Sequence, residues 1–175
     1  KHLLPRLHGY ELMMAPYAIA HMKIGLKLYE TGYHFKSDER ARVYLTNALE
    51  PPQNFSGRLA FAIPALAHEA ETVNMIKRDH SFTVVIGNPP YSGISSNVSE
   101  SVKAAFRAQL DDGTSNYFEI DGEPISERNS KWINDDYIKF LRLAQSTIVN
   151  SGHGIVGMIT NHGFLLNPTF RAVRY

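Results

Sequence analysis

One stretch, residues 83 to 91, constrains what this chain can fold into more than any other. It reads TVVIGNPPY and opens with an apolar run, Thr83 to Ile86, that has no polar alternation. Such a run is typical of a strand covered on both faces, as in a parallel sheet flanked by helices. Pro89 and Pro90 cannot donate to a strand ladder, so the strand ends there. We therefore expect a parallel sheet whose carboxyl edge carries a rigid polar turn from Asn88 to Tyr91.

Strand-like and helix-like patterns alternate along the rest of the chain. In order, they are a strand at 7–12, a helix that begins at Pro16, a strand at 42–49, a helix at 64–78, a helix capped by Asn134 or Asp135, a strand at 155–160 and a last helix that Pro168 opens. In the first helix, Ile19, Met22 and Leu26 recur at helical spacing and are expected to form its apolar face, and Gly32 is expected to cap its end. The alternation predicts an α/β fold with a mostly parallel sheet, helices on both faces and one compact unit.

Residues 92 to 134 differ from the rest because they are rich in Ser, Asn, Asp and Gly, with one short helix expected from Val98 to Leu110. Connections this long inside a domain are usually functional or mobile. Since this one leaves directly from the polar turn, we expect a loop insertion at 92–134. Two hypotheses stand side by side, a substrate-side lid and a disordered insertion.

Two stretches match known motifs in sequence but do not indicate the sites that those motifs usually form. Gly152 to Gly157 fits G-x-G-x-x-G, but it follows a helix and precedes a strand, the reverse of a dinucleotide site, so we interpret it as a helix cap and turn. His68-Glu69 begins like a zinc-protease motif, yet Thr72 stands where the second histidine belongs. No metal site is implied.

The tetrapeptide Asn88-Pro89-Pro90-Tyr91 resembles the signature of amino-group methyltransferases that use S-adenosylmethionine. A ring-conjugated amine attacks a methyl group poorly unless its protons are held out of the ring plane. The Asn88 amide oxygen and the Pro89 carbonyl can accept those protons, Pro90 shapes the turn, and Tyr91 offers a ring for stacking. A plain turn is the alternative, but ordinary composition produces this tetrapeptide by chance on the order of once in a couple of thousand such chains.

Longer stretches extend the resemblance. GYELMMAPYAIAHMKI, YLTNALE, VVIGNPPY and ITNHGFLLNPTFRAVR occur in the order found in bacterial N6-adenine DNA methyltransferases, and the chain looks most like the methyltransferase core of large type ISP restriction-modification enzymes. The resemblance implies a Rossmann-like S-adenosylmethionine-dependent fold, with residues 1–175 forming a partial catalytic domain. It also implies DNA as partner, and target-recognition, nuclease and helicase-like domains elsewhere in the same polypeptide. If the sheet is ordered as in that family, residues 161 to 164 lie beside Asn88.

The same resemblance assigns the cofactor residues. Glu11, followed by Leu12, occupies the position of the acidic residue that binds the ribose hydroxyls of S-adenosylmethionine, although a surface carboxylate is the plain alternative. Asn47 falls where the cofactor adenine is hydrogen-bonded, with Ala48 beside the ring; some relatives use aspartate there. The family's first strand and glycine-rich turn are absent and are expected before Lys1. We therefore expect this part alone to bind the cofactor weakly and to methylate nothing.

Composition limits the partners and the compartment. The net charge is +1, so the basic footprint of a self-sufficient nucleic-acid binder is missing, and most phosphate contacts are expected from elsewhere. The chain has no cysteine, which excludes disulfides and thiolate metal sites and fits the cytoplasm. No membrane segment is visible.

Three classes of function remain open. The first is methylation of adenine N6 in DNA by direct displacement, within a restriction-modification enzyme. The second is methylation of a protein glutamine amide or an RNA guanine amine, since those enzymes use nearly the same loop. The third is a non-enzymatic module of a larger helicase or restriction protein. The intact Asn88 to Tyr91 turn argues against the third class.

Overall fold

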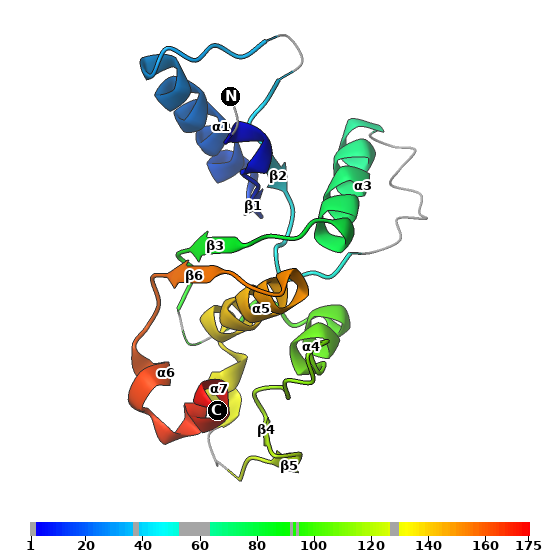
Figure 1. Ribbon diagram of the computed structural model, residues 1–175, viewed down its shortest axis with the longest axis vertical. Coiled ribbons are helices and arrows are strands. Elements are labelled where there is room, and N and C mark those ends of the chain that lie inside the picture. The colour runs from blue at the N-terminus through cyan, green and yellow to red at the C-terminus, as the bar shows by residue number, and fades with distance from the viewer. Residues whose placement is uncertain (1–2, 37–38, 53–63, 92, 94, 127–129) are drawn as a thin grey trace. The chain divides into compact units, whose positions relative to one another are not determined.

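Strands of this chain pair mainly in parallel, as the alternation predicts. The computed structural model describes residues 3–36, 39–52, 64–91, 93, 95–126 and 130–175 of the chain (Figure 1). Within those ranges it is a mixed α/β structure, but the parallel strands form two separate pairs instead of one continuous sheet. Each pair has its own helices, so the chain divides into two compact units, 1–79 and 80–175, where the sequence predicts one. That both units belong to a single catalytic domain stays a prediction.

The first unit is built on one parallel strand pair. Its elements are η1 (Leu4–Arg6), β1 (Gly9–Glu11), α1 (Met14–Glu30), β2 (Val43–Leu45) and α3 (Pro64–Asp79). β1 pairs with β2 so that Gly9 lies opposite Val43 and Glu11 opposite Leu45, and α1 and α3 both contact β2. The start of α3 at Pro64 confirms the predicted boundary, whereas α1 begins two residues before Pro16.

Helix α1 ends as predicted but packs with a different face. Gly32 takes a φ of +77°, and its N–H donates to the carbonyl of Tyr29 at 2.9 Å, a glycine cap. The half-buried positions of the helix are Pro16, Tyr17, Ala20, His21, Ile24, Gly25 and Leu28. The predicted apolar face, with Ile19, Met22 and Leu26, is exposed instead. Because apolar residues surround most of this helix, periodicity alone does not select the packed face.

The second unit contains the other parallel pair. Its elements are β3 (Val84–Gly87), α4 (Glu100–Arg107), β4 (Glu119–Ile120), β5 (Glu123–Pro124), η2 (Ser130–Asn134), α5 (Asp136–Ser151), β6 (Ile155–Met158), α6 (Gly163–Leu166), η3 (Pro168–Phe170) and α7 (Arg171–Arg174). β3 pairs with β6 in parallel, with Val84 opposite Ile155 and Gly87 opposite Met158. β4 and β5 form a small antiparallel hairpin.

The segment 92–134 supplies part of the core of the second unit. Its predicted helix is α4, whose N-cap Ser99 accepts a hydrogen bond from the Val102 N–H at 3.3 Å. The core cluster is made by Phe106, Tyr117, Ile133, Tyr137, Ile138 and Phe170, so half of it comes from this segment. Residues 92, 94 and 127–129 lie outside the described part. The lid and the insertion both stay hypotheses.

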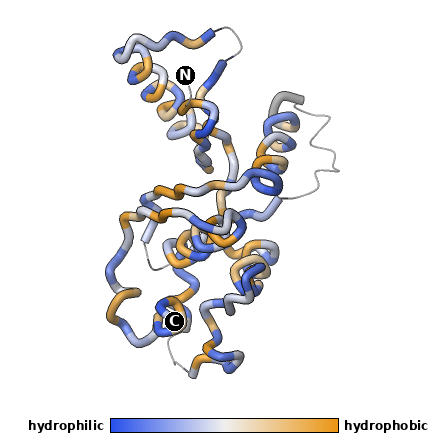
Figure 2. Tube along the Cα trace, in the orientation of Figure 1, coloured by the Kyte–Doolittle hydropathy of each residue, from blue (hydrophilic) through white to orange (hydrophobic). Residues whose placement is uncertain are grey.

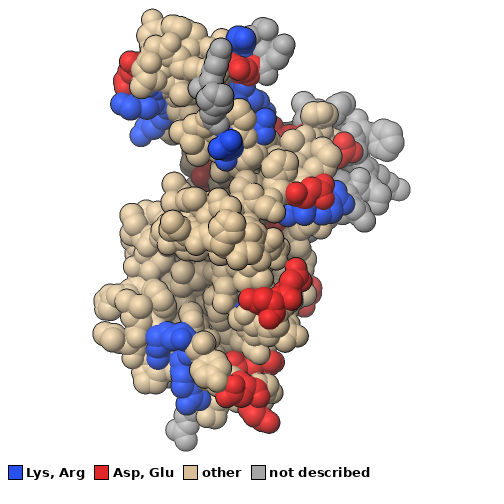
Figure 3. Space-filling view, in the orientation of Figure 1, with Lys and Arg blue, Asp and Glu red and all other residues tan. Residues whose placement is uncertain are grey.

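Strand β3 is less covered than its sequence predicts. Val84 is 60% exposed and Ile86 79% exposed, where we expect burial on both faces. Helix α5 packs against β3 and β6, but a two-stranded sheet with its helix on one side leaves the other side open. Figure 2 shows hydrophobic colour along both strands, and the surface over them in Figure 3 is largely uncharged.

The G-x-G-x-x-G stretch is a helix cap and turn, which confirms our interpretation. Gly152 ends α5 with a φ of +76°, and its N–H donates to the Val149 carbonyl at 2.9 Å. A Cβ on Gly154 would lie 2.5 Å from the carbonyl oxygen of Thr83 and would collide with Ile148. Glycine here therefore lets the chain pass close to the start of β3. No helix in the described ranges is long and apolar enough to cross a membrane.

Candidate functional site

The turn Asn88 to Tyr91 leaves β3 at its carboxyl end. The Gly87 carbonyl still accepts the Ile159 N–H at 3.0 Å, so the chain is paired with the β6 side up to the residue before the turn. Of the four turn residues, Pro89 is buried, while Asn88, Pro90 and Tyr91 are exposed. The Tyr91 side chain is 50% exposed. The amide and the phenol ring are therefore accessible to a substrate, and the buried proline fixes the turn between them.

The end of β6 lies at the same sheet edge, where the predicted residues 161 to 164 follow it. Because β3 and β6 are adjacent and parallel, both carboxyl ends meet there. The Asn161 amide oxygen accepts the Gly163 N–H at 2.7 Å at the start of α6. Phe164 packs against the core, with its ring centroid 6.4 Å from that of Tyr137. The sheet edge thus carries two polar turns.

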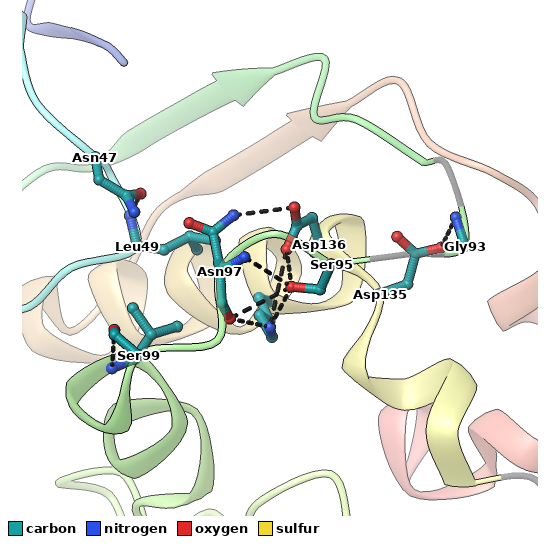
Figure 4. A network of polar contacts seen from close by, with 10 residues as sticks. Asn47, Leu49, Gly93, Ser95, Asn97, Ser99, Asp135 and Asp136 are labelled. Carbon is teal, nitrogen blue, oxygen red and sulfur yellow. Dashed lines mark hydrogen bonds and ion pairs between the residues drawn. The ribbon is translucent and has the colours of Figure 1, made fainter.

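The chain that follows Tyr91 is tied to the start of α5 (Figure 4). Asp135 is the N-cap residue of α5, as predicted, but its carboxylate makes no capping bond to the helix. Its Oδ2 accepts the Gly93 N–H at 3.0 Å instead. Gly93 has a φ of +76°, and a Cβ there would lie 3.1 Å from Cζ3 of Trp132. Glycine is thus favoured here both by the backbone conformation and by the indole beside it.

Asp136 and Lys139 extend this connection as a buried pair. The Asp136 carboxylate accepts the Ser95 hydroxyl at 2.5 Å and the Asn97 side-chain amide at 2.9 Å. The Lys139 Nζ donates to Ser95 Oγ at 2.6 Å and to the Asn97 carbonyl at 2.5 Å. Asp136 and Lys139 are only 3% and 4% exposed, and burial lowers the pKa of Lys139, an effect that Asp136 partly offsets.

Sequence reasoning missed this network. Asp135-Asp136 followed by Lys139 is indistinguishable in sequence from the exposed acidic first turn and i,i+3 pair of an ordinary helix. A usable signal is the apolar neighbourhood, since Tyr137 and Ile138 flank the charges and are core residues.

In the first unit, the predicted cofactor residues gather at one sheet edge. Glu11 ends β1 opposite Leu45, and its carbonyl accepts the Thr46 N–H at 2.8 Å, so Asn47 follows directly beyond the paired residues. Glu11 Oε1 accepts the Met13 N–H at 2.9 Å where the chain enters α1. Asn47 Oδ1 accepts the Leu49 N–H at 3.0 Å and closes its own turn. Leu12 is exposed and Ala48 half-buried.

Lys77 of α3 holds the turn that contains Asn47, which the sequence did not indicate. Its Nζ donates to the carbonyls of Asn47 and Glu50, each at 2.7 Å, and lies 5.5 Å from the centroid of the Tyr10 ring. Burial lowers the pKa of Lys77 to about 8, with Glu50 acting in the opposite direction. Burial also raises the pKa of Tyr10 to about 12, so its phenol stays neutral.

The carboxyl ends of the two parallel strand pairs present hydrogen-bond acceptors and aromatic rings. Within the described residues, no group of three or more His, Asp or Glu side chains gathers as a metal site. Carboxylate, amide and carbonyl oxygens at the ends of parallel strands can bind hydroxyl and amine groups of ligands. The predicted catalytic and cofactor residues lie in different units, and each set is brought together within its own unit.

Comparisons with known proteins identify the relatives of this chain. The family model described as Eco57I restriction-modification methylase matches residues 10–175. Among solved structures, the chain is similar to a nuclease-deletion mutant of the Type ISP restriction-modification enzyme LlaGI in complex with a DNA substrate mimic, with a TM-score of 0.71 and 18% identity over 96% of this chain and 13% of that one. It is also similar to the ATP-dependent Type ISP restriction-modification enzyme LlaBIII bound to DNA, with a TM-score of 0.64 and 22% identity over 96% of this chain and 11% of that one. At these identities the likeness is one of fold. Among curated proteins no sequence matches.

Proposed function

Because the chain belongs to the Eco57I restriction-modification methylase family, we propose that it forms part of an S-adenosylmethionine-dependent methyltransferase acting on adenine N6 in DNA. The observation that carries the proposal is the Asn88 to Tyr91 turn, which leaves a parallel strand at its carboxyl end with Asn88 and Tyr91 exposed. We propose a Rossmann-like arrangement for the complete domain. The chain spans 13% and 11% of the two similar structures, and we propose that the activity is that of a larger polypeptide.

The residues of the turn have separate roles in this proposal. The Asn88 amide oxygen and the Pro89 carbonyl accept the two protons of the adenine amine and free its lone pair for attack. Pro90 keeps the second acceptor in a fixed direction, and Tyr91 stacks on a base turned out of the duplex. These acceptors are in place before reaction, which is what makes them effective.

The first unit offers residues that fit the cofactor. Bound S-adenosylmethionine would supply an electrophilic methyl group. Glu11 would accept its ribose hydroxyls, with Leu12 beside the sugar, and Asn47 would hydrogen-bond its adenine, with Ala48 against the ring. The fit rests on the placement of a carboxylate and an amide turn at the ends of adjacent parallel strands, the edge where such folds bind ligands.

DNA is the proposed substrate and the cytoplasm the proposed compartment. The two similar structures are enzymes solved with DNA or a DNA mimic. A net charge of +1 supplies little attraction for a duplex. We therefore propose that other domains of the same polypeptide make most phosphate contacts and read the target sequence.

Transfer of labelled methyl groups tests the proposal. The complete protein is given labelled S-adenosylmethionine with duplex DNA, RNA and cell protein in parallel reactions. The proposal predicts label in DNA, recovered as N6-methyladenine. Label in a protein glutamine or an RNA guanine would move the assignment to the related amino-methyltransferases, and no label in any acceptor would favour a non-enzymatic module.

A further inference from the structure

Two carboxylates accept hydrogen bonds from the chain just beyond the proposed catalytic turn. We propose that Asp135 and Asp136, at the start of α5, are positioning residues that hold the Asn88 to Tyr91 turn from its C-terminal side. The inference rests on the proposed function, because it concerns the turn to which that function assigns the chemistry. Neither carboxylate is placed in contact with the substrate.

The two sides of the turn are held by different means. On the N-terminal side the β3 ladder continues up to the Gly87 carbonyl, which accepts the Ile159 N–H at 3.0 Å. On the C-terminal side the described residues belong to no strand before α4 begins at Glu100. The first described residue there, Gly93, donates its N–H to Asp135 Oδ2 at 3.0 Å, only two positions after Tyr91.

Asp136 repeats this attachment further along the same segment. Its two oxygens accept hydrogen bonds from Ser95 and Asn97, and Lys139 donates to the same two residues. With the carboxylate 3% exposed and Lys139 4% exposed, removal of one partner would leave another polar group buried without compensation. Gly93, Ser95 and Asn97 are thus each hydrogen-bonded to Asp135 or Asp136 at the start of α5.

The indole of Trp132 lies beside Gly93. A Cβ at Gly93 would lie 3.1 Å from the indole Cζ3, and the Trp132 carbonyl accepts the Asp135 N–H at 3.2 Å. Gly93 therefore donates to the Asp135 carboxylate at a place where the indole of Trp132 leaves little room for a side chain.

Such anchoring matters because methyl transfer depends on alignment. A shift of about 1 Å in the groups that orient a substrate can lower the rate about 100-fold. Proline rigidity within the turn sets its internal shape but not its position relative to β6. We therefore expect loss of the Asp135 contact to lower kcat about 10- to 100-fold, with the KM for S-adenosylmethionine changed less than threefold.

The test uses variants of the complete protein that separate the acceptor oxygen from the charge. Asp135→Ala removes the acceptor for the Gly93 N–H, whereas Asp135→Asn keeps an amide oxygen in its place. Glu100→Gln is the control for loss of a carboxylate at a helix start, because Glu100 begins α4, pairs there with Lys103 and is exposed. Two readouts are taken, kcat with DNA and hydrogen exchange of the peptide that covers residues 87–97.

We expect exchange in that peptide to rise about tenfold in Asp135→Ala, kcat to fall, and both to recover largely in Asp135→Asn, while Glu100→Gln matches the wild type. Unchanged exchange in Asp135→Ala, or equal losses in the alanine and asparagine variants, would overturn the inference. If Asp135→Ala does not fold, Ser95→Ala provides the test. We expect faster exchange and a lower kcat in this variant, and wild-type values of both would contradict the inference. A wild-type protein that methylates nothing would refute the proposed function, while the exchange readout would still judge the anchoring.

Discussion

Lys77 Nζ lies 2.7 Å from the carbonyl oxygen of Asn47, so a helix side chain holds the turn that follows β2. The same ammonium donates to the Glu50 carbonyl at 2.7 Å. The Tyr10 ring lies 5.5 Å from the same nitrogen, and burial lowers the pKa of Lys77 from 10.5 to about 8. This arrangement makes the stability of the turn dependent on pH.

The first prediction concerns that pH dependence. Between about pH 8 and 10.5 the unfolded chain binds more protons at Lys77 than the folded chain, so folding becomes more favourable as the pH rises through this window. The gain is on the order of 1–2 kcal/mol, since partial solvent contact reduces the effect of burial. Hydrogen exchange of the peptide 43–50, corrected for intrinsic rates, measures the free energy of local unfolding at each pH. In Lys77→Met the rise attributed to this lysine should disappear; an unchanged rise would assign it to another group.

A second prediction concerns Gly93. Gly93→Ala should lower the free energy of unfolding by about 2–3 kcal/mol, because alanine is strained at positive φ and its Cβ meets Trp132. Gly113→Ala is the control, since Gly113 has a φ of +87° but nothing within 4 Å of the added Cβ. It should cost only about 1–2 kcal/mol. Denaturant unfolding measures the free energy of unfolding of both variants. Equal losses in the two would show that the Trp132 indole moves aside without cost.

A third prediction concerns the core of the second unit. Ile138 is fully buried in the cluster that joins α5 to the segment 92–134. Ile138→Ala should therefore destabilise the unit by about 2–4 kcal/mol through lost burial and a cavity. Ile155→Ala, at an exposed apolar position of β6, should cost less than about 1 kcal/mol. Thermal unfolding compares the two, and similar losses would mean that β6 is covered in the folded protein.

The fourth prediction separates the hydrogen bond that Glu11 accepts from Met13 from its proposed role in cofactor binding. Glu11→Gln keeps an oxygen that can accept the Met13 N–H, so the melting temperature should stay unchanged. Loss of the carboxylate charge should weaken binding of S-adenosylmethionine by the complete protein about tenfold, because hydrogen bonds to a charged acceptor are the stronger ones. Glu30→Gln, at an exposed glutamate at the end of α1, is the control. Titration calorimetry measures the affinity of both variants for S-adenosylmethionine. Unaltered affinity in Glu11→Gln would leave Glu11 with its structural role alone.

Local rules were sufficient for the elements with strong end signals. Pro64 starts α3, Gly32 and Gly152 end their helices, and Asn88 follows a strand, since proline and positive φ act through nearest neighbours. The packed face of α1 was not predictable, because apolar residues lie on several of its sides. The same limit applies to Ile86, whose β-branched neighbours indicate a strand but not which faces other elements cover.

Some residues of the candidate site were likewise predictable from sequence and others were not. The turn from Asn88 to Tyr91 was predictable from sequence because two prolines end the apolar strand before it, and its catalytic role stays a proposal. Lys77 and Asp136 were missed, because their partners Asn47 and Ser95 are 30 and 41 positions away in the sequence. Contacts at such separation depend on how helices dock on the strand pairs, and no local pattern records that docking.

The most direct test of the central claim compares two quantities in one variant of the complete protein. Asn88 is exposed, so Asn88→Ala should leave the fold intact while removing an acceptor for the adenine amine. We predict a loss of methylation of 100-fold or more, with the affinity for S-adenosylmethionine nearly unchanged. Equal loss of methylation and cofactor affinity would show that Asn88 supports the structure instead of the chemistry, and would contradict the account.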